Sequence, residues 1–353
     1  MVRFLRGAAP TKLTGKVVVF GATTVVGQPL SLLLKLCPHV EEVCCCSVLK
    51  KKACEVGVVS ARGIAADLSH IDTPTVVKTF DDPCNWELAL HGAQLVLVCS
   101  GSTFDPLRVH RDIALADTAA ELVLIMEAVS KAAPSAIVGI VSSPVNALVP
   151  LAREVLQRRS VFDPRKLFGV TTLDVIRIRT LVAEELKINS YDVNVPVVGG
   201  RGGITACPLV AQTGLRIPHE RIVQMSEQLQ AYGAPVTDDA DCDGASGNEH
   251  ALSVDVAPPV GLSLAYAALE WSVSVLKALR GDYGITECGF VESTMRKETP
   301  FFGSRVVLGR EGVEQLLPIG PLTPYETELV ETAVASIAED VEAGFRFAAG
   351  KAK

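Results

Sequence analysis

A glycine-rich segment near the start of the chain has the residue types that bind phosphate. Gly21 and Gly27 stand six residues apart, after the apolar run KVVVF and before a leucine-rich segment. Such a turn between a strand and a helix presents backbone N–H groups to a dinucleotide pyrophosphate. The middle glycine of this pattern lets the backbone approach the phosphates, and here that position is Thr24. The segment therefore predicts a dinucleotide-binding turn with one altered position.

A second position bears on the same chemistry. An acidic residue is expected about twenty residues further on, at the end of the second strand, where it binds the adenosine ribose. Ser47 stands there instead, and Lys50, Lys51 and Lys52 follow. Three interpretations stay open. Dinucleotide binding is weak or absent if Thr24 crowds the phosphates, NADP binds if Ser47 and the lysines hold a 2′-phosphate, or NAD(H) binds despite the substitutions.

The remaining metal-binding and redox signals are weaker. None of the ten cysteines forms a C-x-x-C pair, and no His/Cys cluster has zinc spacing, so we expect buried thiols and no metal. Cys44 to Cys46 are consecutive, which leaves a redox role as a minor alternative. The segment DADCDG at 239–244 resembles the start of a calcium loop, but the required glutamate falls on His250. We interpret it as a solvated acidic loop.

The composition limits the classes of protein to consider. The 353 residues are 48% hydrophobic, which predicts a large buried core and about two domains. No apolar run reaches the roughly 18 residues of a membrane helix. The net charge of −7 and an aromatic content of 5% argue against general nucleic-acid binding.

The elements that must position these residues alternate in type through the first half. Apolar runs at 16–21, 43–48, 95–100 and 136–142 predict buried strands, and helical segments at 28–34 and 114–133 separate them. This order predicts an α/β fold whose residues 16–155 form a Rossmann-type, doubly wound parallel sheet.

The second half, 156–353, is mixed and predicts an α+β domain. It contains a strand at 194–200, long helices at 263–279 and 324–349, and an acidic loop insertion at about 234–259. Residues 1–15 form a basic tail, for which a mitochondrial presequence and an ordinary basic terminus are both consistent with the residues. We expect a mitochondrial location, with a cytoplasmic one as the alternative.

From residue 16 onward the sequence resembles malate dehydrogenases of the mitochondrial and bacterial type. The resemblance implies a Rossmann-type domain, a lactate/malate-dehydrogenase-like C-terminal domain, NAD-linked oxidoreduction of a 2-hydroxy acid and a homodimer. The segments that carry it are GQPLSLLLK (27–35), GIAADLSHI (63–71), SPVNALVP (143–150), KLFGVTTLDVIR (166–177), VNVPVVGG (193–200), LSLAYAA (262–268), ECGFV (287–291) and FFGSRVVLG (301–309).

The resemblance also locates an acid–base pair. Family members use a histidine, held by an aspartate, as proton acceptor from the substrate hydroxyl. The aspartate corresponds to Asp174, but the histidine position in the glycine turn is Arg201. A guanidinium has a pKa above 12 and no lone pair, so it cannot act as a general base at neutral pH. We expect Arg201 and Asp174 to form an ion pair.

The substrate positions implied by the resemblance are only partly present. Arg177 and Arg111 correspond to two of the three substrate arginines, whereas the loop arginine that binds the far carboxylate is replaced at about Phe104. Ser143 stands where an asparagine would bind the substrate oxygen, and Asn146 is kept. Losing an arginine fork removes bidentate recognition of the second carboxylate. His110, in the same loop, is a minor alternative for the missing base.

Five site positions thus differ from the residues that the family resemblance implies: Thr24, Ser47, Phe104, Ser143 and Arg201. We predict a catalytically inactive homologue that serves as a structural or regulatory subunit, with no cofactor or weakly bound NAD(H). It would pair with itself, with an active paralogue or within a larger assembly. The alternative is an active NAD(P)-dependent 2-hydroxyacid dehydrogenase with a more apolar substrate, which Phe104 would favour. A ligand-binding or redox-sensing module is the third hypothesis.

Overall fold

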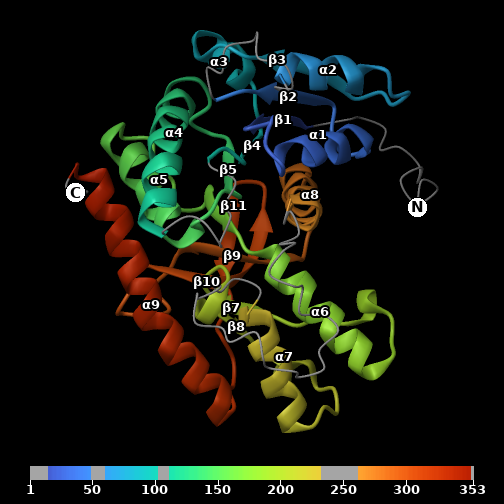
Figure 1. Ribbon diagram of the computed structural model, residues 1–353, viewed down its shortest axis with the longest axis vertical. Helices are drawn as coiled ribbons and strands as arrows, with labels where there is room; N and C mark the ends of the chain where they lie inside the picture. The colour runs from blue at the N-terminus through green and yellow to red at the C-terminus, as the bar shows by residue number, and fades with distance from the viewer. Residues whose placement is uncertain (1–14, 49–59, 102–110, 232–260, 351–353) are drawn as a thin grey trace, which may run out of the picture.

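Strands and helices alternate through the first half of the chain, as the sequence predicted. The computed structural model describes residues 15–48, 60–101, 111–231 and 261–350 (Figure 1). The four predicted strands are present with slightly shorter bounds, and two further strands, β3 and β6, complete this part of the sheet. The strands are β1 (Lys16–Phe20), β2 (Glu42–Cys46), β3 (Val76–Phe80), β4 (Leu95–Val98), β5 (Ile137–Ile140) and β6 (Leu167–Val170).

These six strands are all parallel and lie in the order β3-β2-β1-β4-β5-β6. This is the strand order of a Rossmann fold, in which the chain reverses direction of travel across the sheet between β1 and β4. The predicted fold class is confirmed. The helices that connect the strands are α1 (Gly27–Leu36), α2 (Ala61–Ser69), α3 (Trp86–Leu90), α4 (Arg111–Ala132) and α5 (Val145–Arg158).

The second half extends the same sheet with antiparallel strands. β6 pairs with β9 through Gly169 and Phe290, and the order continues β9-β10-β7-β8, with β11 beside β10. Residue 155, the predicted domain boundary, lies inside α5. The added elements are α6 (Thr172–Leu186), β7 (Val197–Gly199), β8 (Ala206–Pro208), α7 (His219–Ala231), α8 (Gly261–Arg280), β9 (Ile285–Glu292), β10 (Phe301–Gly309), β11 (Gly312–Leu316) and α9 (Pro324–Ala348).

Alternating side chains explain why both faces of the sheet are covered. Along β1, Val17 and Val19 pack on one face and Val18 and Phe20 on the other, all fully buried. Figure 1 shows α4, α5 and α9 on one side of the sheet and α1 and α8 on the other. Strands with near-continuous apolar runs are typical of parallel sheets buried on both faces.

Helix α8 is long and apolar enough to cross a membrane by length and composition alone, and half of its apolar window is buried. Trp271 on this helix is fully buried and makes an edge contact with Phe168 of β6, at 5.4 Å between ring centroids. The packing of α8 against the sheet therefore explains why this helix is so apolar.

The long final helix has a start signal that is visible in the sequence. The Thr323 hydroxyl accepts a hydrogen bond from the Glu326 backbone N–H at 3.2 Å, and the Glu326 carboxylate accepts one from the Thr323 N–H at 2.9 Å. This capping box satisfies two donors that a helix start leaves unpaired. The helix that starts here, α9, packs against α5, which carries Asn146 of the candidate site.

Candidate functional site

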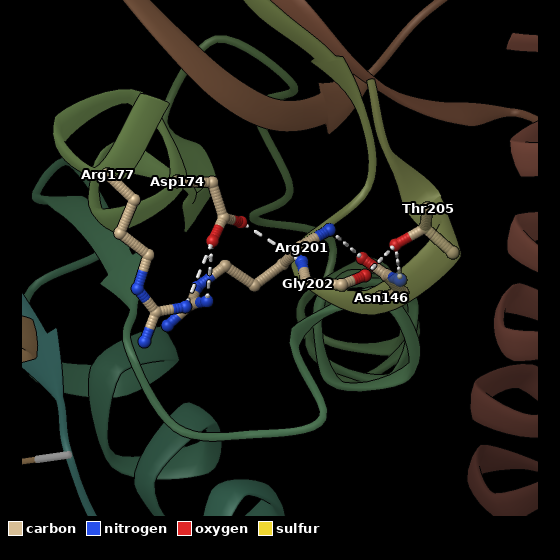
Figure 2. A network of polar contacts seen from close by, with 6 residues as sticks. All are labelled: Asn146, Asp174, Arg177, Arg201, Gly202 and Thr205. Atoms are coloured by element: carbon tan, nitrogen blue, oxygen red, sulfur yellow. Dashed lines mark hydrogen bonds and ion pairs between the residues drawn. The ribbon is translucent and has the colours of Figure 1, made fainter. Parts of the chain in front are cut away.

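Three connections at the carboxyl ends of strands bring the polar residues of the site together. β5 leads through Ser143 into α5, which carries Asn146; β6 leads into α6, whose first turn carries Asp174; and β7 leads into the turn that contains Arg201. Crevices at this edge of an open α/β sheet are where ligands bind. Figure 2 shows the side chains of these three segments converging.

Asp174 is the buried centre of this cluster, with no solvent exposure. Its Oδ1 atom lies 3.3 Å from Arg201 Nη1 and 3.7 Å from Arg177 Nη1, and its Oδ2 atom accepts a hydrogen bond from the Gly202 N–H at 3.0 Å. The ion pair expected between Asp174 and Arg201 is present. Both carboxylate oxygens are engaged, which offsets the cost of burying a charge.

Asn146 holds the turn that carries Arg201. Its Oδ1 atom accepts a hydrogen bond from the Arg201 backbone N–H at 2.9 Å, and its Nδ2 group donates to Thr205 Oγ1 at 3.3 Å and to Asp340 Oδ2 at 3.0 Å. Asn146 is 3% exposed, so these contacts satisfy an amide that would otherwise be costly to bury. Thr205 closes the turn by donating to the Gly202 carbonyl at 2.7 Å.

The backbone of this turn requires glycine at its start. Gly199 has a φ of +98°, and a Cβ atom there would lie 2.2 Å from the Thr205 carbonyl oxygen. A Cβ atom on Gly200 would lie 2.7 Å from Thr205 Oγ1 and 2.8 Å from Asn146 Nδ2. The glycines therefore allow Asn146 and Thr205 to approach the chain closely and fix where Arg201 begins.

The cluster offers hydrogen-bond donors but no proton acceptor of the histidine type. Arg201 carries only donors, and Asp174 is already bonded on both oxygens. The four histidines that the structure describes lie elsewhere: His39 beside Arg280, His70 at the end of α2, His91 at the end of α3 and His219 against Tyr325.

The other predicted substrate positions are placed less completely. Ser143 is half-buried and precedes α5, and its peptide bond to Pro144 is cis. Arg111 is the first residue of α4, and its side chain lies outside what the structure describes. Phe104 and His110 both fall outside the described residues, so the roles predicted for them stay predictions.

The glycine turn lies between β1 and α1, where the sequence placed it. A Cβ atom on Gly27 would lie 2.0 Å from the Gly21 carbonyl oxygen, and Gly21 itself has a φ of +82°. Thr24 Oγ1 accepts a hydrogen bond from the Gly27 N–H at 3.0 Å and donates to the Cys99 carbonyl at 3.0 Å. The hydroxyl thus bonds within the turn and to the end of β4, and it uses one of the N–H groups at the start of α1.

Ser47 lies directly after β2, where the acidic residue of such a unit was expected. Its backbone N–H donates to the Phe80 carbonyl at 3.3 Å, and the preceding Cys46 carbonyl accepts hydrogen bonds from Gly21 and Ala22. Ser47 is therefore fixed beside the glycine turn, but one hydroxyl cannot bind both ribose hydroxyls as a carboxylate does.

The cysteines of β2 are unsuited to redox chemistry. Burial raises the pKa of the Cys44 thiol to about 12 and of the Cys45 thiol to about 11, and it raises the pKa of Cys46 as well. Protonated thiols are poor nucleophiles at neutral pH. Among the described residues, no three His, Cys, Asp or Glu side chains are grouped to hold a metal ion. The acidic loop at 239–244 lies outside them.

Two residues of the network escaped the sequence reasoning. Thr205 follows the glycine turn closely, but nothing in its type marks it as a contact of Asn146. Asp340 lies 194 residues from Asn146 in the chain. The sequence feature that could have identified Asp340 is its place on the buried side of the apolar helix α9. A charged group in such a place requires a polar partner.

Comparison with known protein families decides the ancestry of this site. Residues 15–169 match the NAD-binding domain of lactate/malate dehydrogenases, and residues 171–254 and 259–348 match the alpha/beta C-terminal domain of the same enzymes. The chain belongs to the lactate/malate dehydrogenase family. The two matched regions meet near residue 170, at the end of β6.

Curated relatives in this family cover nearly the whole chain. The glyoxysomal malate dehydrogenase of Oryza sativa is 39% identical over 97% of this chain and 88% of its own length. Malate dehydrogenase 2, mitochondrial, of Arabidopsis thaliana is 36% identical over 94% of this chain and 91% of its own length. Other relatives are named chloroplastic and peroxisomal, so the family does not assign a compartment to this chain.

Solved structures of the family share the fold at lower identity. Malate dehydrogenase from Cryptosporidium parvum is 21% identical, with a TM-score of 0.71 over 93% of this chain and 98% of its own. Lactate dehydrogenase from Eimeria maxima, solved with NADH and oxamate, is 18% identical, with a TM-score of 0.72 over 98% of both chains. These likenesses concern the fold alone.

Proposed function

We propose that this lactate/malate dehydrogenase-family protein does not oxidise malate and serves as a structural or regulatory subunit. The observation that carries the proposal is the buried contact of Arg201 with Asp174, at 3.3 Å, in the position where the family resemblance places the acid–base histidine. The relatives reported above are named malate dehydrogenases, so the proposal sets this chain apart from them.

The chemical argument rests on what a guanidinium can do. It holds its protons at neutral pH and has no lone pair, so the described residues of this cluster offer a substrate hydroxyl no histidine-type group to receive its proton. Positioned acid–base catalysis contributes roughly 10²–10⁴ in rate, and that contribution is lost. Asp174 does not substitute for it, because Arg177, Arg201 and the Gly202 N–H already engage its two oxygens.

We propose that NAD(H) binds weakly at the turn between Gly21 and Gly27. The close-packed turn and the helix start support binding, since they present the backbone to a pyrophosphate as the family fold requires. Thr24 bonds to the Gly27 N–H, and Ser47 replaces a carboxylate, which both argue for low affinity. When bound, the nicotinamide would supply the hydride acceptor or donor, while this chain would only hold it.

The test combines binding and turnover on the purified protein. Titration with NADH and NADPH, followed by assays with oxaloacetate and phenylpyruvate, should give weak NADH binding and no turnover. The Oryza sativa relative assayed beside it provides the positive control. Clear turnover of oxaloacetate would contradict the proposal. Turnover of phenylpyruvate would establish the alternative, a dehydrogenase for a more apolar 2-oxo acid.

Two further assignments concern assembly, for which the family resemblance is the basis, and location, for which the basic N-terminal segment is the basis. We propose a homodimer, which light scattering would report as twice the 37.4 kDa chain mass; a monomer mass would contradict it. We also propose that the basic residues 1–15 direct the protein to mitochondria. A fusion of this segment to a fluorescent protein should localise there, and a diffuse signal would favour the cytoplasm.

A further inference from the structure

Helix α6, whose first turn carries Asp174, is tied to α8 by polar contacts outside the candidate site (Figure 1). Arg179 Nη2 of α6 lies 3.3 Å from Glu270 Oε2 of α8, and the Tyr266 hydroxyl donates to Glu270 Oε1 at 2.6 Å. The Arg179 guanidinium also lies over the Tyr191 ring, with its carbon 5.7 Å from the ring centroid. Both oxygens of Glu270 are therefore engaged, and Arg179 provides the charge that joins the two helices.

A second carboxylate, Glu287 of β9, faces the same arginine without pairing with it. Its Oε1 atom accepts a 2.5 Å hydrogen bond from the Ser274 hydroxyl of α8. The negative charge of Glu270 and the positive charge of Arg179 act on Glu287 in opposite directions. Two carboxylates thus share the influence of one guanidinium, so the cluster has an excess negative charge when both are ionised.

The remaining groups around Glu287 keep one charge state near neutral pH. Burial raises the pKa of the Tyr266 hydroxyl, and it raises the pKa of the Cys288 thiol to about 11, so both stay protonated. Strand β10 places the apolar Val306 opposite Glu287 and the permanently charged Arg305 opposite Cys288. Burial raises the pKa of Glu287 itself to about 7, so this side chain gains its charge as the pH passes through neutrality.

Arg179 has a donor to offer when that charge appears. Its Nε atom is buried and has no hydrogen-bond partner among the described residues, which is an unfavourable state for a donor. A half-buried carboxylate without a cation attracts one in its surroundings. We propose that Arg179 is a proton-sensitive switch, which pairs with Glu270 alone while Glu287 is protonated and is shared with Glu287 once that carboxylate ionises. The sharing weakens the contact between α6 and α8, so α6 is held less firmly above neutral pH than below it.

Infrared difference spectroscopy of the full chain tests the proton step, because a protonated carboxyl group has a carbonyl band that a carboxylate lacks. The band that disappears in Glu287→Gln should titrate with a midpoint near neutral pH. Glu270→Gln removes a like charge and should lower this midpoint, whereas Arg179→Gln removes an opposite charge and should raise it. Midpoints that do not move, or that move in the same direction in both variants, would overturn the proposal.

Hydrogen exchange followed by mass spectrometry tests the coupling to α6. At about pH 6, the parent and Glu287→Gln should exchange alike over residues 172–186, because both have a neutral side chain at 287. At about pH 8 only the parent is ionised there, and its α6 amides should exchange at least about threefold faster than those of the variant. The control segment is α2, which should exchange alike in both proteins. Equal exchange over α6 at both pH values, or a difference of the same size over α2, would overturn the proposal.

Ser274→Ala retains the test if Glu287→Gln folds poorly. The Ser274 hydrogen bond favours the ionised form of Glu287, so its loss should move the onset of faster α6 exchange to higher pH. An unchanged onset would also contradict the switch. None of these measurements uses nucleotide or substrate, so their outcome is independent of the proposed loss of catalysis.

Discussion

Two glycine turns of this protein, 21–27 before α1 and 199–205 after β7, have changed in different ways. Both keep backbones that only glycine allows, since a Cβ atom on Gly27 or Gly199 would lie 2.0 or 2.2 Å from a carbonyl oxygen of its own turn. In the first turn the altered residue, Thr24, is neutral and bonds locally. In the second, Arg201 brings a charge that is paired with a carboxylate of another element.

The difference teaches how a fold can be kept while its chemistry changes. The Thr24 hydroxyl bonds to nearby backbone groups and changes only how strongly the first turn binds a dinucleotide. The turn can therefore still approach a pyrophosphate. A guanidinium in place of an imidazole removes a proton acceptor, and no adjustment of distance restores it. The first turn should therefore behave as a weakened binding site and the second as an altered one.

The largest effect is expected from removing the carboxylate between the arginines. Asp174→Ala leaves the half-buried Arg177 and Arg201 near each other without the buried carboxylate that they share, and breaking a buried pair in this way costs about 3–5 kcal/mol. Urea unfolding followed by circular dichroism measures it. Asp163→Ala, which removes a partner of the exposed Arg165, is the control and should lose far less. Similar losses in both variants would show that the pair at Asp174 is not special.

The hydrogen bonds that hold the second turn should contribute somewhat less. Asn146→Ala leaves the Arg201 N–H, Thr205 and Asp340 without this buried amide, so we expect a loss of about 2–3 kcal/mol in unfolding free energy. The control is Gln212→Ala, whose side chain donates to the Ile319 and Pro321 carbonyls in a more exposed place. If Asn146→Ala were as stable as the parent, Asn146 would not fix the turn.

Glu287 provides a comparison with Asp174, because the described residues give it no ion pair with an arginine of the kind that Asp174 makes. Burial raises the pKa of Glu287 to about 7, and its side chain accepts a 2.5 Å hydrogen bond from the Ser274 hydroxyl, with Glu270 and Arg179 nearby. Because the folded state then holds this proton more tightly than the unfolded chain, stability should fall as pH rises from about 4.5 through 7. The decline attributable to Glu287 is on the order of 2 kcal/mol, after allowing for partial exposure. In Glu287→Gln it should be absent; an unchanged decline would assign it to other groups.

The smallest effect is expected in the first turn. Thr24→Gly restores the glycine of the phosphate-binding pattern and frees the Gly27 N–H, so NADH should bind roughly tenfold tighter, a change of about 1.4 kcal/mol. Fluorescence titration with NADH measures this change. Thr24→Ser keeps the hydroxyl and should bind like the parent. If Thr24→Gly bound NADH no more tightly than the parent protein, the weak binding would be attributed to Ser47 instead.

The sequence predicted much of this arrangement because the informative residues are close to recognisable elements. The strand before Gly21 and the order of strands and helices follow from apolar runs, and the pairing of Arg201 with Asp174 follows from the family resemblance and charge. What the sequence did not predict depends on side-chain direction and distant contacts. Nothing in it shows that Thr24 Oγ1 turns back to bond with the Gly27 N–H, or that Asp340 reaches Asn146 from the last helix.

Restoring the histidine tests whether Arg201 alone accounts for the lost activity. Arg201→His should still show little malate oxidation, because Thr24, Ser47 and Ser143 stay altered. A rise to ordinary dehydrogenase rates in steady-state assays would show that the other substitutions matter little.

The most direct measurement of the central claim follows the hydride itself. The protein at stoichiometric concentration is incubated with oxaloacetate and NADH deuterated at C4 of the nicotinamide, and the acids are analysed by mass spectrometry. With Arg201 in place of the acid–base histidine, we predict no deuterated malate above the protein-free control, while the Oryza sativa relative forms it readily. Deuterated malate formed by this chain within a few turnovers would contradict the account.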